Sequence, residues 1–160
     1  DFLVKNGIKA INIGTAGIRP MQLQQMGATA PSHLRRLGFD ALHLVDTTFC
    51  VEANAAYGAK ALLDAFLVSP QDAVSLADRE AMDTLGVSVE QLLEACAGAP
   101  VEAAAVLEQC MGPTALEGVS ANTLLSTGLR APQLKTLGFS LQSVRKCGSA
   151  AEIGKLGFSL

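Results

Sequence analysis

The fold is decided near the C-terminus by residues 128–147, which read GLRAPQLKTL and then GFSLQSVRKC. Both ten-residue blocks begin with glycine and carry apolar residues at positions 2, 4, 7 and 10. A shorter block begins at Gly148, and another begins at Gly157. Apolar residues three positions apart share one face of a helix, so these blocks predict a series of short helices.

The same register extends back to the N-terminus. Unit starts are expected at residues 118, 108, 98, 86, 77, 67, 58, 48, 38, 27, 17 and 7. Twelve of the fifteen glycines then occupy position 1, and the exceptions are Gly14, Gly112 and Gly154. We therefore predict an all-α fold, an α-solenoid of about sixteen short helices joined by Gly-containing turns. The section from 67 to 117 is the least regular, and a longer helix is expected there at residues 89–97.

Each position of a unit has a physical role. Glycine at position 1 is expected to end the preceding helix in the left-handed conformation, and the apolar residue after it folds back on that helix. The predicted turn glycines are Gly17, Gly27, Gly38, Gly118, Gly128, Gly138, Gly148 and Gly157. Ser88 with Gln91, and Ser149 with Glu152, have the spacing of a capping box. All six prolines fall at positions 3 to 6, where a missing N–H costs little.

Positions 4, 7 and 10 are expected to form the core. The candidate core residues are Leu23, Leu44, Leu92, Leu124, Leu134, Val144 and Ile153. Helices of six or seven residues are unstable alone, so each must pack on its neighbours, with contacts nearly all local in sequence. Residues 1–160 are predicted to be a single helical-repeat domain. We expect a fragment of a longer array or an end covered by a partner, because the chain stops mid-unit at Leu160 without a polar cap.

The run LKTLGFSL at residues 134–141, echoed at 34–44 and 155–160, resembles a known type of tandem repeat. Short LxxLGFS or LxxAGFS repeats of this kind occur in protist, algal and large-virus proteins. The resemblance covers most of the chain in period and about five units in motif. Because those arrays share no established activity, the resemblance implies an α-helical repeat scaffold and no site residues.

Composition excludes several classes of protein. Hydrophobic residues make up 49% of the chain, which is too high for general disorder. No apolar run is long enough for a membrane span, and the first residues lack the features of a signal peptide, so an intracellular protein is expected. The four cysteines have no CxxC spacing and are expected to be reduced and mostly buried.

Charge is segregated along the chain behind a formal net charge of −3. The balance is +2 over residues 1–47, −9 over 48–117 and +4 over 118–160. Two interpretations stay open: a solvated surface whose charges follow the helix dipoles, or electrostatic complementarity with partners or between copies. The candidate interaction surface comprises Glu90, Glu94, Glu102, Arg130, Lys135, Arg145 and Lys146.

No catalytic, cofactor or metal site is predicted. His43 has helical spacing with Asp46, as a base and its orienting acid would, but no nucleophile stands in a recognisable context beside them. His33 falls where other units place a core leucine. The glycine-containing segment at residues 12–17 lacks the phosphate-loop spacings and fits the repeat register instead. Cys50 and Cys110 fall at expected N-cap positions, where a helix N-terminus can lower a thiol pKa.

These observations predict a non-enzymatic scaffold or structural protein that mediates protein–protein interactions within a larger assembly. Its partners would be proteins, including neighbouring copies or other subunits. The alternative is a modular helical-repeat protein that reads nucleic acid, but the acidic middle and the scarcity of aromatic residues disfavour it. An enzyme or ligand-binding domain is a third class, and it would require a deep pocket with convergent polar groups.

Overall fold

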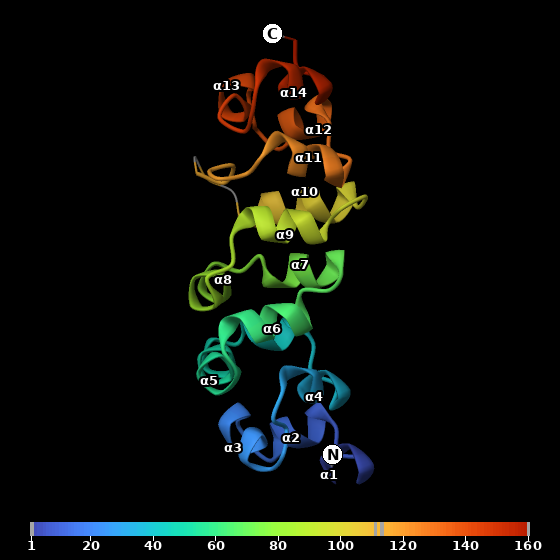
Figure 1. Ribbon diagram of the computed structural model, residues 1–160, viewed down its shortest axis with the longest axis vertical. Helices are drawn as coiled ribbons and strands as arrows, with labels where there is room; N and C mark the ends of the chain where they lie inside the picture. The colour runs from blue at the N-terminus through green and yellow to red at the C-terminus, as the bar shows by residue number, and fades with distance from the viewer. Residues whose placement is uncertain (1, 111, 113, 160) are drawn as a thin grey trace.

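The computed structural model describes residues 2–110, 112 and 114–159, and all regular structure within them is helical. The molecule is elongated, and its helices follow one another from the N-terminus at one end to the C-terminus at the other (Figure 1). The N-terminal half contains α1 (Phe2–Lys5), α2 (Ala10–Thr15), α3 (Pro20–Gln25), α4 (Pro31–Arg36), the 3-10 helix η1 (Ala41–Val45), α5 (Thr47–Tyr57), α6 (Ala59–Phe66) and α7 (Pro70–Leu76). The C-terminal half contains α8 (Arg79–Leu85), α9 (Val89–Ala95), α10 (Pro100–Gln109), α11 (Ala121–Thr127), α12 (Ala131–Thr136), α13 (Leu141–Val144) and α14 (Ala150–Lys155). Among all the described residues, no helix is long and apolar enough to cross a membrane.

Glycine turns separate most of these helices. Positive φ angles occur at seven predicted turn glycines: Gly17, Gly27, Gly38, Gly118, Gly128, Gly138 and Gly157. The backbone N–H after the glycine reaches back five residues to a carbonyl, as from Phe39 to Leu34 (3.1 Å) and from Phe139 to Leu134 (2.9 Å). This is the bond of a Schellman cap, and Phe39 and Phe139 are both buried beside it.

Gly148 was predicted to be a left-handed turn residue, and this is wrong. Its φ is not positive, because α13 ends early at Val144 and the chain turns through the residues that follow. A Cβ at Gly148 would lie 3.0 Å from the Cβ of Ala121 and 2.8 Å from Oε2 of Glu152. Glycine therefore serves here to let the turn approach α11 closely.

The helix starts follow the predicted chemistry. Both capping boxes, Ser88 with Gln91 and Ser149 with Glu152, are confirmed. Five prolines lie in the first turn of a helix: Pro20, Pro31, Pro70, Pro100 and Pro132. The sixth, Pro113, lies outside the described residues.

The expected sixteen helices are not reached within the described residues, and the register fails in two places. Asp46 caps α5 by accepting the N–H of Phe49 (2.8 Å), and with no glycine at position 48 the helix begins at Thr47, before the expected unit start. The unit expected at 108 has no helix of its own in its described part, since α10 occupies its first residues and turns follow. The longer helix expected at 89–97 is wrong, because α9 ends at Ala95 after seven residues.

Helices also pack on helices about three units away, so contacts are not nearly all local in sequence as expected. Such pairs are α3 with α5, α4 with α6, η1 with α7, α7 with α10, α9 with α11, and α11 with α14. We call the contact between such a pair a three-unit joint. Most of its side-chain hydrogen bonds join residues 29 to 33 positions apart, and that from Tyr57 to the carbonyl of Pro20 spans 37. The chain changes direction after every short helix. A helix therefore makes more extensive contact with a helix three units later than with the next helix in the sequence.

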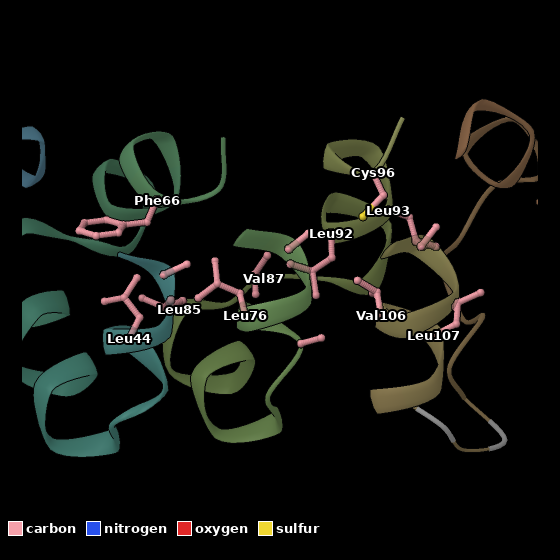
Figure 2. Packing of buried hydrophobic residues seen from close by; sticks show 14 of the residues in the cluster. Leu44, Phe66, Leu76, Leu85, Val87, Leu92, Leu93, Cys96, Val106 and Leu107 are labelled. Atoms are coloured by element: carbon pink, nitrogen blue, oxygen red, sulfur yellow. The ribbon is translucent and has the colours of Figure 1, made fainter. Parts of the chain in front are cut away.

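All seven predicted core residues are buried: Leu23, Leu44, Leu92, Leu124, Leu134, Val144 and Ile153. Figure 2 shows the middle of this core, where Leu44 of η1, Leu76 of α7, Leu92 of α9 and Val106 of α10 follow one another along the molecule. The core therefore runs the length of the stack, and no single unit encloses its own.

Candidate interaction surface

Acidic side chains form part of the three-unit joints. Gln71 of α7 donates to Glu102 of α10 across 3.0 Å, and Asn122 of α11 donates to Glu152 of α14 across 3.2 Å. An ion pair joins Arg19, next to α3, to Glu52 of α5. Position 5 of a unit thus repeatedly supplies the acceptor that binds a unit three places earlier.

Glu90 and Glu102 were predicted to face partners, but the structure places both in joints. Glu90 accepts the hydroxyl of Thr123 (2.9 Å) and the backbone N–H of Ser120 (3.2 Å). The Thr123 hydrogen bond is the main reason that the pKa of Glu90 lies below its ordinary value. Glu102 is half-buried and accepts from Gln71, so neither carboxylate is a free surface charge.

The other predicted surface residues are exposed: Glu94, Arg130, Lys135, Arg145 and Lys146. Lys135 lies 5.6 Å from the ring centroid of Phe158, and Arg130 donates to the carbonyl of Leu129 (2.8 Å). Arg145 and Lys146 follow α13, where the chain turns towards α14. The structure therefore separates the candidate residues into two structural carboxylates and a set that solvent can reach.

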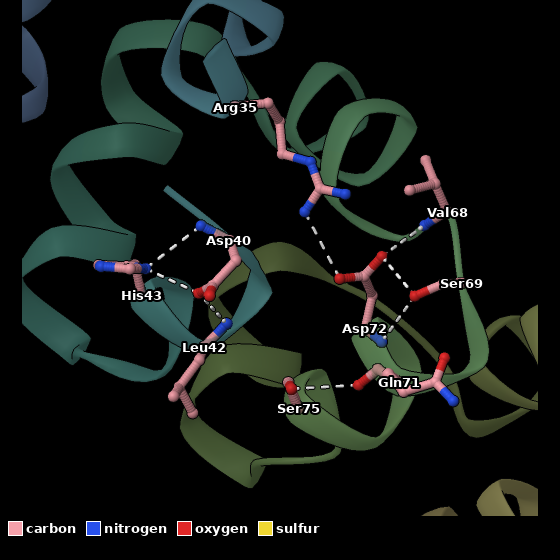
Figure 3. A network of polar contacts seen from close by, with 9 residues as sticks. All are labelled: Arg35, Asp40, Leu42, His43, Val68, Ser69, Gln71, Asp72 and Ser75. Carbon is pink, nitrogen blue, oxygen red and sulfur yellow. Dashed lines mark hydrogen bonds and ion pairs between the residues drawn. The ribbon is translucent and has the colours of Figure 1, made fainter. Parts of the chain in front are cut away.

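A polar network links the first half of the stack (Figure 3). Asp72 is nearly buried, with 8% exposure, and accepts the Ser69 hydroxyl (2.8 Å) while pairing with Arg35 (3.5 Å). The guanidinium of Arg35 also lies 5.4 Å from the centroid of the Phe66 ring. This network fixes α4 against α6 and α7, which is a structural role.

The sequence spacing predicted that His43 pairs with Asp46, but in the structure it pairs with Asp40. Nδ1 of His43 lies 2.7 Å from Oδ1 of Asp40 in the cap of η1. Burial raises the pKa of Asp40, but the hydrogen bond and charge of His43 outweigh it, and the net shift is downward. His33 is half-buried, and its Nδ1 is buried without a hydrogen-bond partner. Within the described residues no three His, Cys, Asp or Glu side chains are grouped so as to hold a metal ion.

The prediction that Cys50 and Cys110 are N-cap residues is wrong. Cys50 lies inside α5, and Cys110 is the C-cap residue of α10. Burial raises the pKa of both thiols, the opposite of the shift expected at a helix N-terminus. Cys96 and Cys147 are buried, and burial raises the pKa of Cys96 to about 11. These thiols are structural apolar groups at neutral pH.

The structure also contains an apolar groove that the sequence analysis missed. This N-terminal groove, of about 490 Å³, is lined by Ala10, Ile11, Ile13, Gly14, Thr15, Ile18, Phe39, His43, Asp46 and Phe49. The rings of Phe39 and Phe49 stack in it at 5.1 Å between centroids. A signal was available: position 5 is apolar at Ile11 and Leu42 but polar in most later units.

A second groove, of about 750 Å³, lies where the unit expected at 108 lacks a helix. Leu116 and Glu117 line one side of it, and Phe139, Gln142 and Lys146 line the other. Its lining mixes polar and apolar groups without convergent titratable side chains.

Comparisons with known proteins do not identify a family for this chain. No protein-family model, curated protein or solved structure matches the chain.

Proposed function

We propose that this chain is an α-solenoid of the LxxLGFS type that serves as a non-enzymatic scaffold, holding protein partners within a larger assembly. The observation that supports this most is the repetition of the three-unit joint from α3 to α14. A stack built by one recurring joint presents a long surface whose outward side chains are free to vary. Such a surface suits protein recognition better than it suits chemistry.

The acidic middle is the part of this surface that best fits a partner. Several carboxylates there are exposed and stand outside the described joints, including Asp83 on α8, Glu94 on α9 and Glu108 on α10. The segment from 48 to 117 carries a net charge of −9, which would steer a basic protein surface towards it. Binding to this region should therefore weaken as salt is raised.

A charge-reversal experiment tests the proposal. The immobilised chain is used to isolate partners from cells, and each partner is then purified and measured directly against two variants. Asp83→Lys with Glu94→Lys should abolish binding of partners that need the acidic middle, whereas Arg145→Glu with Lys146→Glu should leave it unchanged. Both pairs are exposed, so folding should survive, and circular dichroism checks this. Partners that bind both variants and the wild type equally would refute the acidic surface as the docking site.

A nucleic-acid reader is supported by one observation, the exposed basic residues of the C-terminal segment. Arg130, Lys135, Arg145 and Lys146 all reach solvent in a region of net charge +4. Salt-dependent binding of single-stranded RNA, lost in the Arg145→Glu, Lys146→Glu variant, would favour this function over the protein scaffold. No binding at low salt would exclude it.

A further inference from the structure

Most of the exposed large apolar side chains in the described residues belong to the first third of the sequence. Five of the large apolar residues that are exposed among the described residues lie between positions 11 and 51: Ile11, Met21, Met26, Leu42 and Val51. Ile11 and Leu42 are 75% and 64% exposed. The described C-terminal residues beyond Val101 include no such side chain. Clustered exposed apolar groups mark interaction sites more often than scattered ones do.

Ile11 and Leu42 replace the polar groups of a joint. Both occupy position 5 in units three places apart, on α2 and η1. Two joints further along this row, from α7 to α10, the same position holds Gln71 and Glu102, which hydrogen-bond at 3.0 Å. The step from α2 to η1 instead leaves the N-terminal groove open between its helices. Stability of the stack does not explain why Ile11, which lines an unfilled apolar groove, is exposed.

The groove and Ile11 together make a self-complementary surface. The floor of the groove is apolar, with Ile13 buried and Phe49 stacked on Phe39. Ile11 stands at its edge and reaches well into solvent. A surface that carries both a knob and a hole can satisfy itself across a two-fold axis, as isologous dimers require.

We propose that the N-terminal groove is a self-association site, in which two copies of this chain place Ile11 of each in the groove of the other. Charge favours a second copy as the occupant. A two-fold contact sets each region against itself, and residues 1–47 carry only +2, against −9 in the middle and +4 at the C-terminal end. Lys9 and Asp46, exposed and of opposite sign, border this region, so it presents both charges to its twin. The inference deepens the proposed scaffold function, because it names one partner as the chain itself.

Sedimentation velocity on the purified chain, from about 1 to about 200 µM, tests this proposal. The wild type should show a reversible monomer–dimer equilibrium. Ile11→Lys should raise the dimer Kd by about tenfold or more, since it removes the knob and places charge in an apolar groove. Val101→Lys is the matched control: Val101 is 77% exposed on α10, and this variant should dimerise like the wild type.

Leu42→Lys is a second variant, for use if Ile11→Lys does not fold. Leu42 is exposed and adjacent in sequence to His43, which lines the groove, so this variant should also weaken the dimer. A chain that stays monomeric throughout the range would overturn the proposal, as would a dimer that tolerates both Ile11→Lys and Leu42→Lys. Equal loss from Val101→Lys would also overturn it, because the contact would then be nonspecific. A partner that still needs Asp83 and Glu94 would keep the scaffold function even if the chain never dimerises.

Discussion

Two glycines of the C-terminal units should respond with opposite signs to the same substitution. Gly138 has φ of +85°, and a Cβ built on it would meet nothing within 4 Å. Gly138→Ala therefore adds no clash and isolates the cost of holding an L-residue in the left-handed region, about 1 kcal/mol. Gly154 lies inside α14 with ordinary helical backbone and equally open space, so Gly154→Ala should stabilise the protein by about 0.5–1 kcal/mol.

Thermal and urea unfolding, followed by circular dichroism at 222 nm, measure both variants against the wild type. For a chain of this size, Gly138→Ala should lower Tm by about 2–4 °C. Gly154→Ala should raise it by about 1–3 °C. A Gly138→Ala protein as stable as the wild type would refute the role of positive φ at the turn. If Gly154→Ala were the more damaging change, the assignment of helix and turn within the unit would be wrong.

Three further predictions follow from the core, the caps and the joints. Leu134→Ala should destabilise the protein by about 2–5 kcal/mol in urea unfolding, because Leu134 is fully buried between turns of the stack. Ser149→Ala should cost about 1 kcal/mol in the same assay through loss of the α14 cap, whereas Ser149→Asp should retain most of the stability. The folded-state pKa values of Glu90 and Glu152 lie below the ordinary 4.5, mainly because of hydrogen bonds from Thr123 and Ser149 respectively. The stability that these carboxylates add is therefore present above pH 4.5 and is lost as the pH falls through the folded-state pKa. The urea midpoint should therefore fall between pH 5 and 3, and Glu90→Gln should flatten the fall.

Local chemistry explains why so much of the helix pattern could be predicted from the sequence. Glycine, proline and the capping serines act within four or five residues of themselves, so their spacing reports helix ends directly. The same holds for core residues such as Leu134, which lie on the buried face of their own helix. Where a local signal was missing the prediction failed, as at residue 48, where Asp46 starts a helix before the expected boundary.

The joints and the interaction surface could not be predicted because they depend on distance along the chain. Nothing in one ten-residue unit says which later unit will lie against it, so Glu90 and Glu102 looked like free surface charges. Their partners, Thr123 and Gln71, lie 33 and 31 residues away. The N-terminal groove was missed for the same reason, since Ile11 and Phe49 come to line one groove only when their units are stacked.

A joint that spans three units constrains how such a chain can change in length. Some turn glycines lie beside the first helical residue of an earlier unit, as Gly128 does against Pro100 and Gly157 against Ala131. Loss of one unit would place every later helix against a different partner. It would also separate hydrogen-bonded pairs that span a joint, such as Gln71 and Glu102. Loss of three consecutive units would instead remove one whole turn and bring equivalent helices together again. The contacts repeat every three units and not every unit, so a stack of this kind can change in length only by whole groups of three units. Where a glycine lies against a residue three units earlier, the absence of a side chain lets the two groups pack closely.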